Sequence, residues 1–232
     1  MGDLVYKKIM ENLQQISLSK QRMFSEIECP RYFHRRKPTI VFKNLKDDYT
    51  LEVNVSFDVT YDEKMKDVLT ILNCILGEGV GSKLQRCIRE EMCYSSDIAS
   101  YIEWYRKYAV LHIRFSVEKK NLLLCLKEII MLLNDMKRAV VREDLDVTLP
   151  FYTTNQMFLE DDTEEMNFQL AYHVFILESE YKKVNLDNSP NSIVMIQQTA
   201  MEILTKKNMS VVIVGNTKGI TKKSILEIIE DM

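Results

Sequence analysis

Two segments of the chain alternate strictly between apolar and polar residues, the pattern of a β-strand with one buried face. In residues 51–59 every second residue is apolar: Leu51, Val53, Val55, Phe57 and Val59 alternate with Glu52, Asn54, Ser56 and Asp58. Residues 109–117 repeat the pattern, with Ala109, Leu111, Ile113, Phe115 and Val117 on one side and Val110, His112, Arg114 and Ser116 on the other. Such regular alternation is typical of an antiparallel sheet covered on one face only. We predict this sheet, with residues 39–42 and 94–101 as partner strands.

Helical spacing of apolar residues marks the segments that would cover the sheet. Residues 64–76 and 119–137 place apolar side chains three and four positions apart, as an amphipathic helix does. The resulting order of strand, strand, helix, helix, strand, strand, helix predicts an α+β fold with helices on one face of an antiparallel sheet.

The chain after residue 140 is predicted to be mostly helical. Asp162 and Glu165 are spaced as a capping box for a helix that runs to about residue 177 and is apolar over most of its circumference. Ser192 is expected to cap a helix that runs to residue 204. A short buried strand over 210–215 and a final helix over 221–231 follow.

The N-terminal residues predict a separate leading element. Residues 3–17 have apolar positions at helical spacing, and residues 28–38 form a connector with two prolines around an aromatic and basic stretch. We therefore expect a leading helix and connector over 1–28 and one α+β domain over 29–232. Within that domain, 29–140 is rich in strands and 141–232 is rich in helices.

Composition narrows the functional classes. Hydrophobic residues make up 46% and charged residues 28% of the 232 residues, as in an ordinary globular protein. The net charge is −3, and Arg35-Arg36-Lys37 is too short a basic cluster to indicate nucleic-acid binding. No apolar run approaches the roughly 18–20 residues that span a membrane. Five cysteines without a C-x-x-C pair favour a reducing compartment. The first residues, Met1-Gly2-Asp3-Leu4, are polar and acidic, so we expect no signal peptide and a cytoplasmic protein.

Motifs for metal or phosphate chemistry are weak. The three histidines, His34, His112 and His173, are far apart, and neither H-E-x-x-H nor H-x-x-E-H occurs. We expect His173 to be a hydrogen-bonded core or interface residue and His112 to face solvent. The acidic run 160–162 lacks the ligand spacing of an EF-hand loop, so it is expected to be a solvated helix cap.

The glycine-rich segment 77–82 has two possible interpretations. As a phosphate loop it would need a preceding strand, whereas here it follows a predicted helix, and no Walker lysine is present. A turn between two helices, with Ser82 capping the second, is the simpler interpretation. A small-molecule enzyme that uses this loop is the remaining alternative.

Residues 71–90, ILNCILGEGVGSKLQRCIRE, followed by Tyr94, resemble a segment of the pitrilysin/insulinase-type metallopeptidases, to which mitochondrial processing peptidase belongs. That segment reads as a helix, L-G-x-G, a small residue, S-x-L, R-E and then a tyrosine that opens a strand. The resemblance extends over roughly residues 38–216. It implies a domain of the processing-peptidase or LuxS type.

The resemblance also implies a role. Family members pair two homologous domains or subunits around a chamber; one binds zinc through H-x-x-E-H, and the other is metal-free. This chain is similar to the metal-free half, called inactive, so the resemblance implies no catalysis and no cofactor here, with zinc expected on the partner. In active relatives that half supplies an arginine and a tyrosine that hold the substrate, and these correspond to Arg89 and Tyr94. The family usually has two more residues between them.

Further expectations concern the sheet face, the partner and the role of the chain. The uncovered sheet face would line the chamber, with Glu52, Asn54, Asp58, His112 and Arg114 on it, and a peptide could add as a strand to a sheet edge. The leading hypothesis is a non-catalytic domain that pairs with a zinc-bearing homologue and helps to bind a peptide substrate; a homodimer is a further possibility. The alternative is a structural or assembly subunit of a larger complex, with no peptide role.

Overall fold

The computed structural model describes residues 38–45, 49–60, 63–106, 108–183 and 190–232. All of them lie in the compact unit Tyr32–Met232. The predicted leading helix, His34 and the basic cluster 35–37 lie outside the described residues, so the predicted domain boundaries stay a prediction. Among the described helices, none combines the length and the apolarity needed to cross a membrane.

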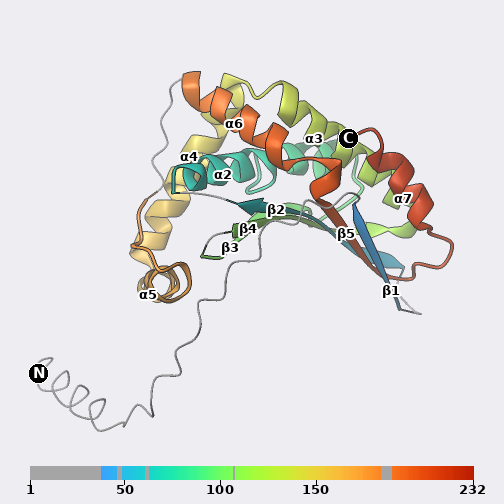
Figure 1. Cartoon of the computed structure of the whole chain (residues 1–232), viewed down its shortest axis with the longest axis horizontal. Helices are drawn as coiled ribbons and strands as arrows, with labels where there is room; N and C mark the ends of the chain where they lie inside the picture. The colour runs from blue at the N-terminus through green and yellow to red at the C-terminus, as the bar shows by residue number, and fades with distance from the viewer. Residues whose placement is uncertain (1–37, 46–48, 61–62, 107, 184–189) are drawn as a thin grey trace, which may run out of the picture. The chain divides into compact units, whose positions relative to one another are not determined.

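Five strands form one sheet, in the order β1-β5-β2-β4-β3 (Figure 1). They are β1 (Thr39–Asn44), β2 (Thr50–Thr60), β3 (Ala99–Trp104), β4 (Tyr108–Glu118) and β5 (Met209–Gly215). The pairs β5–β2, β2–β4 and β4–β3 are antiparallel, while β1 and β5 pair in parallel. The predicted fold class, α+β with helices on one face of the sheet, is confirmed.

The helices occupy the predicted segments and one more. They are α2 (Glu63–Leu76), α3 (Leu122–Arg138), α4 (Arg142–Asp161), α5 (Thr163–Tyr172), α6 (Pro190–Ile203) and α7 (Lys222–Ile229). Two π-helices, η1 (Gln85–Glu91) and η3 (His173–Leu177), and two short 3-10 helices, η2 (Lys119–Asn121) and η4 (Lys206–Asn208), join them.

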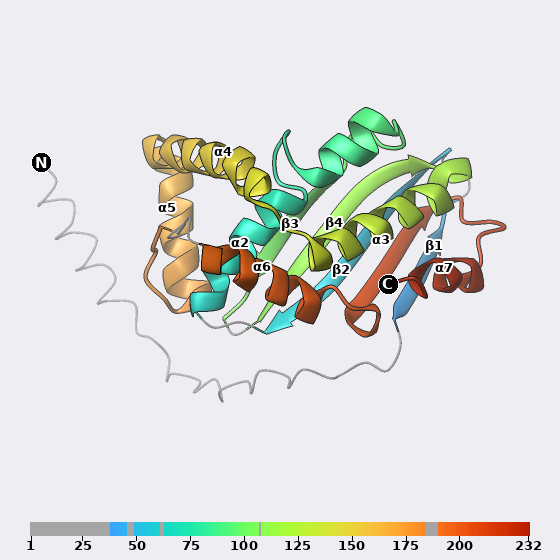
Figure 2. The ribbon, with the colours of Figure 1, turned by 90° about the horizontal axis from the view of Figure 1, so that it is seen from above.

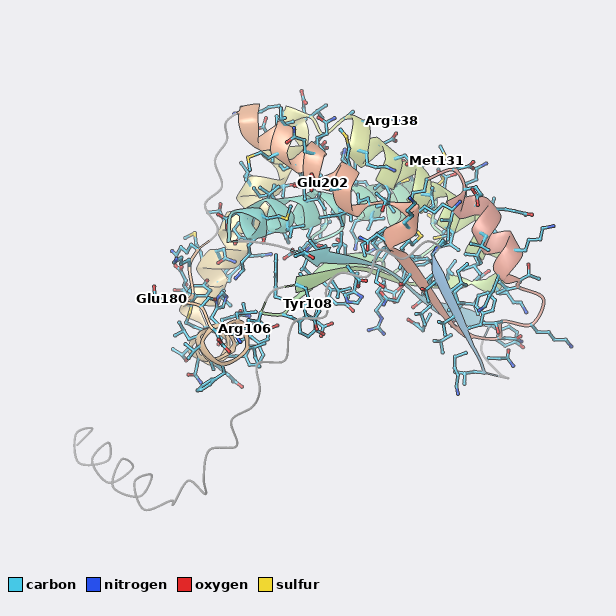
Figure 3. The ribbon with its side chains drawn as sticks, viewed as in Figure 1. Arg106, Tyr108, Met131, Arg138, Glu180 and Glu202 are labelled. Atoms are coloured by element: carbon cyan, nitrogen blue, oxygen red, sulfur yellow. The ribbon has the colours of Figure 1, made fainter. Side chains whose placement is uncertain are left out.

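The core lies between the sheet and the helices α2, α3 and α6, which run across one face of it (Figure 2). The alternating apolar residues of β2 and β4, from Leu51 to Val59 and from Ala109 to Val117, are at most 2% exposed. Met131 and Arg138 on α3 point away from the sheet (Figure 3). The predicted periodicities therefore locate the buried faces of β2, β4, α2 and α3 correctly.

The sheet differs from the prediction in two places. Residues 39–42 do lie in a strand, but β1 pairs with β5 rather than with either central strand. β5 enters between β1 and β2, so it pairs with residues about 150 to 170 positions away in the sequence. Tyr94 is not in a strand, because β3 begins at Ala99.

Two helix caps also differ. Asp162 accepts hydrogen bonds from the backbone N–H groups of Glu164 and Glu165, as predicted. The Glu165 carboxylate, however, accepts from Gln169 in the next turn instead of reaching back to close a capping box. α6 begins at Pro190, so Ser192 lies inside the helix and is not its cap; proline suits the first helical position because it has no N–H to leave unpaired.

Candidate functional site

The glycine-rich segment forms a turn between α2 and η1, as the simpler interpretation predicts. Gly79 has φ +95°, a conformation that glycine adopts without strain. The Ser82 hydroxyl donates to the Gly79 carbonyl at 2.7 Å. Ser82 therefore closes the turn through its side chain. The prediction that Ser82 caps the following helix is wrong, because its hydroxyl donates back to Gly79 and only its carbonyl, which accepts from the Arg86 N–H, takes part in that helix. The segment follows a helix, so it lacks the strand that a phosphate loop requires.

Arg89 is exposed on η1, where its Nη1 donates to the Gln85 side chain at 3.3 Å. The other end of that side chain, Gln85 Nε2, donates to the carbonyl of Ile98, just before β3. The guanidinium carries five N–H donors, so this one contact leaves it able to bind a carbonyl or carboxylate. Arg89 is thus held by a neighbour that is itself anchored to the sheet.

Tyr94 lies in the bend between η1 and β3, half-buried against the core. Its backbone N–H donates to the carbonyl of Ile88 at 3.0 Å, so the backbone returns to the residue next to Arg89. Cys93 between them has φ +53°, which turns the chain sharply. The fold brings the two backbone segments together, and the described contacts include none between the Arg89 and Tyr94 side chains.

A buried ion pair fixes the start of this segment. Lys83 Nζ lies 2.6 Å from Asp144 Oδ1 on α4, and the Asp144 side chain is only 6% exposed. The other Asp144 oxygen accepts from the Val141 N–H at 3.0 Å. Lys83 lies two residues before the start of η1, so the pair holds the Arg89-bearing helix against α4.

The uncovered sheet face carries the polar residues predicted to line a chamber. Asn54 Nδ2 lies 3.1 Å from His112 Nδ1, and the His112 ring stacks on Tyr101 with centroids 4.9 Å apart. Only 14% of the His112 side chain is exposed, so the prediction that it faces solvent is wrong. The reason is the flanking strand β3, whose Tyr101 ring covers it. Burial lowers the pKa of His112, against the opposing influence of Glu103.

A second cluster of polar side chains on this face connects β4, β2 and the loop before β3. The Ser116 hydroxyl lies 2.6 Å from Glu52 and 2.7 Å from Asp97, and Glu52 also pairs with Arg114 at 3.8 Å. Although partial burial opposes the shift, the hydrogen bonds from Ser116 lower the pKa of Asp97. The face is therefore charged and hydrogen-bonded, unlike the apolar face beneath the helices.

His173 is a buried, hydrogen-bonded residue, as predicted. Its Nδ1 lies 3.3 Å from the Ser179 hydroxyl and its Nε2 lies 3.4 Å from Lys66 Nζ. A lysine ammonium at this distance opposes a divalent cation. Within the described residues, no group of three His, Cys, Asp or Glu side chains could hold a metal ion, so the donor set does not fit zinc.

The outer edge of β3 is partly occupied. The Ser100 N–H donates to the Gly77 carbonyl at 3.1 Å, and the Tyr172 hydroxyl donates to the Trp104 carbonyl. A peptide strand added here would have to displace both bonds. This edge is therefore a poor site for the strand addition that the sequence suggests.

The apolar residues of α5 and η3 lie mostly on the surface. α5 has no buried residue, and five apolar side chains of α5 and η3 are between 46 and 79% exposed: Phe168, Leu170, Val174, Phe175 and Ile176. We call these five residues the α5 apolar surface. Several large apolar side chains exposed on one short segment mark a candidate interaction site. Sequence reasoning found the apolar residues but placed no interface on them.

Comparison with known families gives one match over most of the chain. The model of a family described as "Peptidase M16 inactive domain" matches residues 5–149. No curated protein matches the chain.

Solved structures share the fold at low sequence identity. A protease from Helicobacter pylori matches with a TM-score of 0.69 and 15% identity, covering 90% of this chain and 52% of its own. A peptidase M16 inactive domain from Pseudomonas fluorescens matches with 0.55 and 16%, over 78% of this chain and 44% of its own. A chain of Complex III2 from Candida albicans matches with 0.64 and 8%, over 82% and 49%. The chain spans about half the length of the structures it matches.

Proposed function

This chain belongs to the peptidase M16 inactive-domain family, and from that membership we propose that it is the non-catalytic partner of a zinc-bearing M16 homologue. Zinc and the water-activating base would reside on the partner, which carries H-x-x-E-H. This chain would contribute a docking surface and contacts to an extended peptide.

The α5 apolar surface is the observation that carries the pairing. A ten-residue helix without a buried residue gains little from folding onto its own domain, since most helical stability comes from packing of an apolar face. The solved structures that match are about twice as long as this chain, which leaves a second unit of similar size to cover the surface. The partner therefore docks on α5 and η3.

Replacement of Phe168 and Phe175 by serine tests the pairing. These side chains are 58 and 79% exposed, so the free domain should keep its melting temperature within about 2 °C. Burial of each phenyl ring at an interface contributes about 1.5–3 kcal/mol, so the double variant should weaken association with the H-x-x-E-H homologue about 100-fold or more. Leu124→Ser on α3, 52% exposed, is the control. Undiminished association of the double variant, or equal loss in the control, contradicts the docking site.

Arg89 and Tyr94 are proposed to contact the peptide bound between the two halves. Both are on one anchored segment, and the guanidinium can donate to a peptide carbonyl or to an oxyanion that develops on it. Arg89→Ala should lower peptide hydrolysis by the reconstituted pair at least tenfold without affecting association. Arg86→Ala, an exposed arginine on the same helix, should leave hydrolysis unchanged.

A scaffold without a peptide role is the second candidate. It is favoured by the structural match to a chain of Complex III2, an assembly. Under this alternative, Arg89→Ala and Tyr94→Phe leave the partner's activity intact, while removal of this domain lowers the partner's stability. The two variants therefore separate the candidates within one reconstituted system.

A further inference from the structure

A cavity of about 410 Å³ lies where α2, β3, α4, α5 and η3 meet, on the helix-covered side of the β3 edge. This volume is within the range of small-molecule sites, about 300–1,000 Å³. No residue of the α5 apolar surface lines this cavity, and neither does Arg89. Aromatic side chains from four different segments form much of its wall: Trp104, Tyr152, Tyr172 and Tyr181.

Two of these aromatic rings are fixed by hydrogen bonds at their polar ends. The Tyr172 hydroxyl donates to the Trp104 carbonyl, and the Tyr181 hydroxyl donates to Gln156 Oε1 at 3.1 Å. Tyr181 also meets the His173 ring edge to face, with centroids 5.3 Å apart. The wall is therefore organised before any ligand enters, which lowers the entropic cost of binding.

Lys66 brings a positive charge to this aromatic wall. Its ammonium lies 5.5 Å from the centroid of the Trp104 ring and 3.4 Å from His173 Nε2. Burial and the Lys66 charge lower the pKa of His173. A neutral His173 can donate to Ser179 through Nδ1 and accept from Lys66 through Nε2, which orients the ammonium.

The charged groups of the wall favour an anion. Among the lining residues that the structure describes, Lys66 and Lys182 are cationic and Glu78 carries the single carboxylate. That carboxylate already accepts hydrogen bonds from Asn73 Nδ2 at 2.7 Å and from the Cys74 thiol at 3.3 Å. Burial, together with the Glu78 charge, raises the pKa of Cys74 and keeps it protonated as a donor. The negative charge of Glu78 is thus stabilised by two hydrogen bonds from α2.

From these contacts we propose that the cavity binds a carboxylate carried next to an aromatic ring, with Lys66 holding the carboxylate and Trp104 and the tyrosines packing against the ring. A free arylalkanoic acid and the C-terminal residue of an aromatic peptide both present this chemistry. Ligand binding in this cavity requires neither the partner nor Arg89. A negative result here would therefore leave the proposed function untouched, and the reverse also holds.

Trp104 is the only tryptophan of the chain, and its fluorescence reports directly on the cavity. Phenylacetate and N-acetylphenylalanine are titrated into the full chain, each beside its uncharged amide, phenylacetamide or N-acetylphenylalaninamide. The expected result is a saturable change in emission, with each acid binding at least fivefold more tightly than its amide. A lower dissociation constant for N-acetylphenylalanine assigns the site to peptide C-termini, and a lower one for phenylacetate assigns it to free acids.

Lys66→Met should abolish the preference for acid over amide, and Lys66→Arg, which keeps the charge, should retain it. Lys127→Met, an exposed lysine on α3, is the control and should bind like the parent chain. Circular dichroism melts verify that each variant is folded. Equal binding of acid and amide by the parent chain, or an unchanged preference in Lys66→Met, overturns the proposal. If Lys66→Met does not fold, the same comparison in Lys66→Arg and the parent chain decides.

Discussion

The ion pair between Lys83 and Asp144 gives the sharpest test of how the Arg89 segment is held. Two ion pairs of the chain have the same N–O distance of 2.6 Å but differ in burial. In Lys83–Asp144 the side chains are 21 and 6% exposed, and in Lys120–Glu118 they are 76 and 55% exposed. Only the first should contribute much to stability, because solvent screens the second.

Lys83→Met removes the ammonium and keeps most of the aliphatic chain. It leaves the Asp144 carboxylate buried, with the Val141 N–H as its remaining partner among the described residues. Loss of one partner of a fully buried pair costs about 3–5 kcal/mol. Since Lys83 is partly exposed and the Val141 bond survives, we expect about 2–3 kcal/mol. A domain of this size loses about 2–4 °C per kcal/mol, so the melting temperature should fall by about 5–10 °C.

Urea denaturation of both single variants measures the difference. Lys120→Met should lose less than about 1 kcal/mol. The double variant Lys83→Met/Asp144→Asn removes the buried charge but keeps an acceptor for Val141, so it should recover at least half of the loss. Equal losses in Lys83→Met and Lys120→Met would refute the reasoning that burial, rather than distance, sets the strength of the pair.

The remaining predictions concern one turn and one pH effect. Gly79→Ala should cost at least about 2 kcal/mol in urea denaturation, because a Cβ there would lie 2.5 Å from the Phe151 ring at φ +95°. Gly219→Ala, at φ +87° in open space, should cost about 1 kcal/mol; equal losses contradict a steric cause. Burial lowers the pKa of both His112 and His173, so the unfolded chain binds protons first as the pH falls. The unfolding free energy should be fully retained above about pH 6.5 and decrease below it, and His112→Gln should reduce that slope.

The local pattern of apolar and polar residues predicted those helices and strands that bury one face and expose the other. The period-two residues of β2 and the helical spacing in α2 and α3 each bury one face, so the pattern is sufficient. α4 was not resolved as a separate helix because Pro150 lies within it and its apolar positions follow no clear period. The parallel pairing of β1 with β5 depends on where a distant strand inserts, which no local pattern encodes.

In the candidate site, too, features set by local sequence could be predicted, and features set by contacts between distant segments could not. The glycine-rich turn before Arg89 could be predicted from sequence because its residue types and spacing are characteristic, while the role of Arg89 stays a prediction. The position of Tyr94 before β3, the coverage of His112 by Tyr101 and the exposure of Phe175 are all set by contacts between segments. Tertiary packing decides such features, so sequence reasoning misplaced the first two and left the third unassigned.

Reconstitution with the zinc-bearing homologue tests the central claim most directly. The chain and the H-x-x-E-H protein are purified separately, and zinc content and peptide hydrolysis are measured for each alone and for the mixture. We expect a one-to-one complex in which hydrolysis requires both proteins and all zinc is bound to the partner. Stoichiometric zinc on this chain together with chelator-sensitive peptide cleavage by it alone would contradict the account.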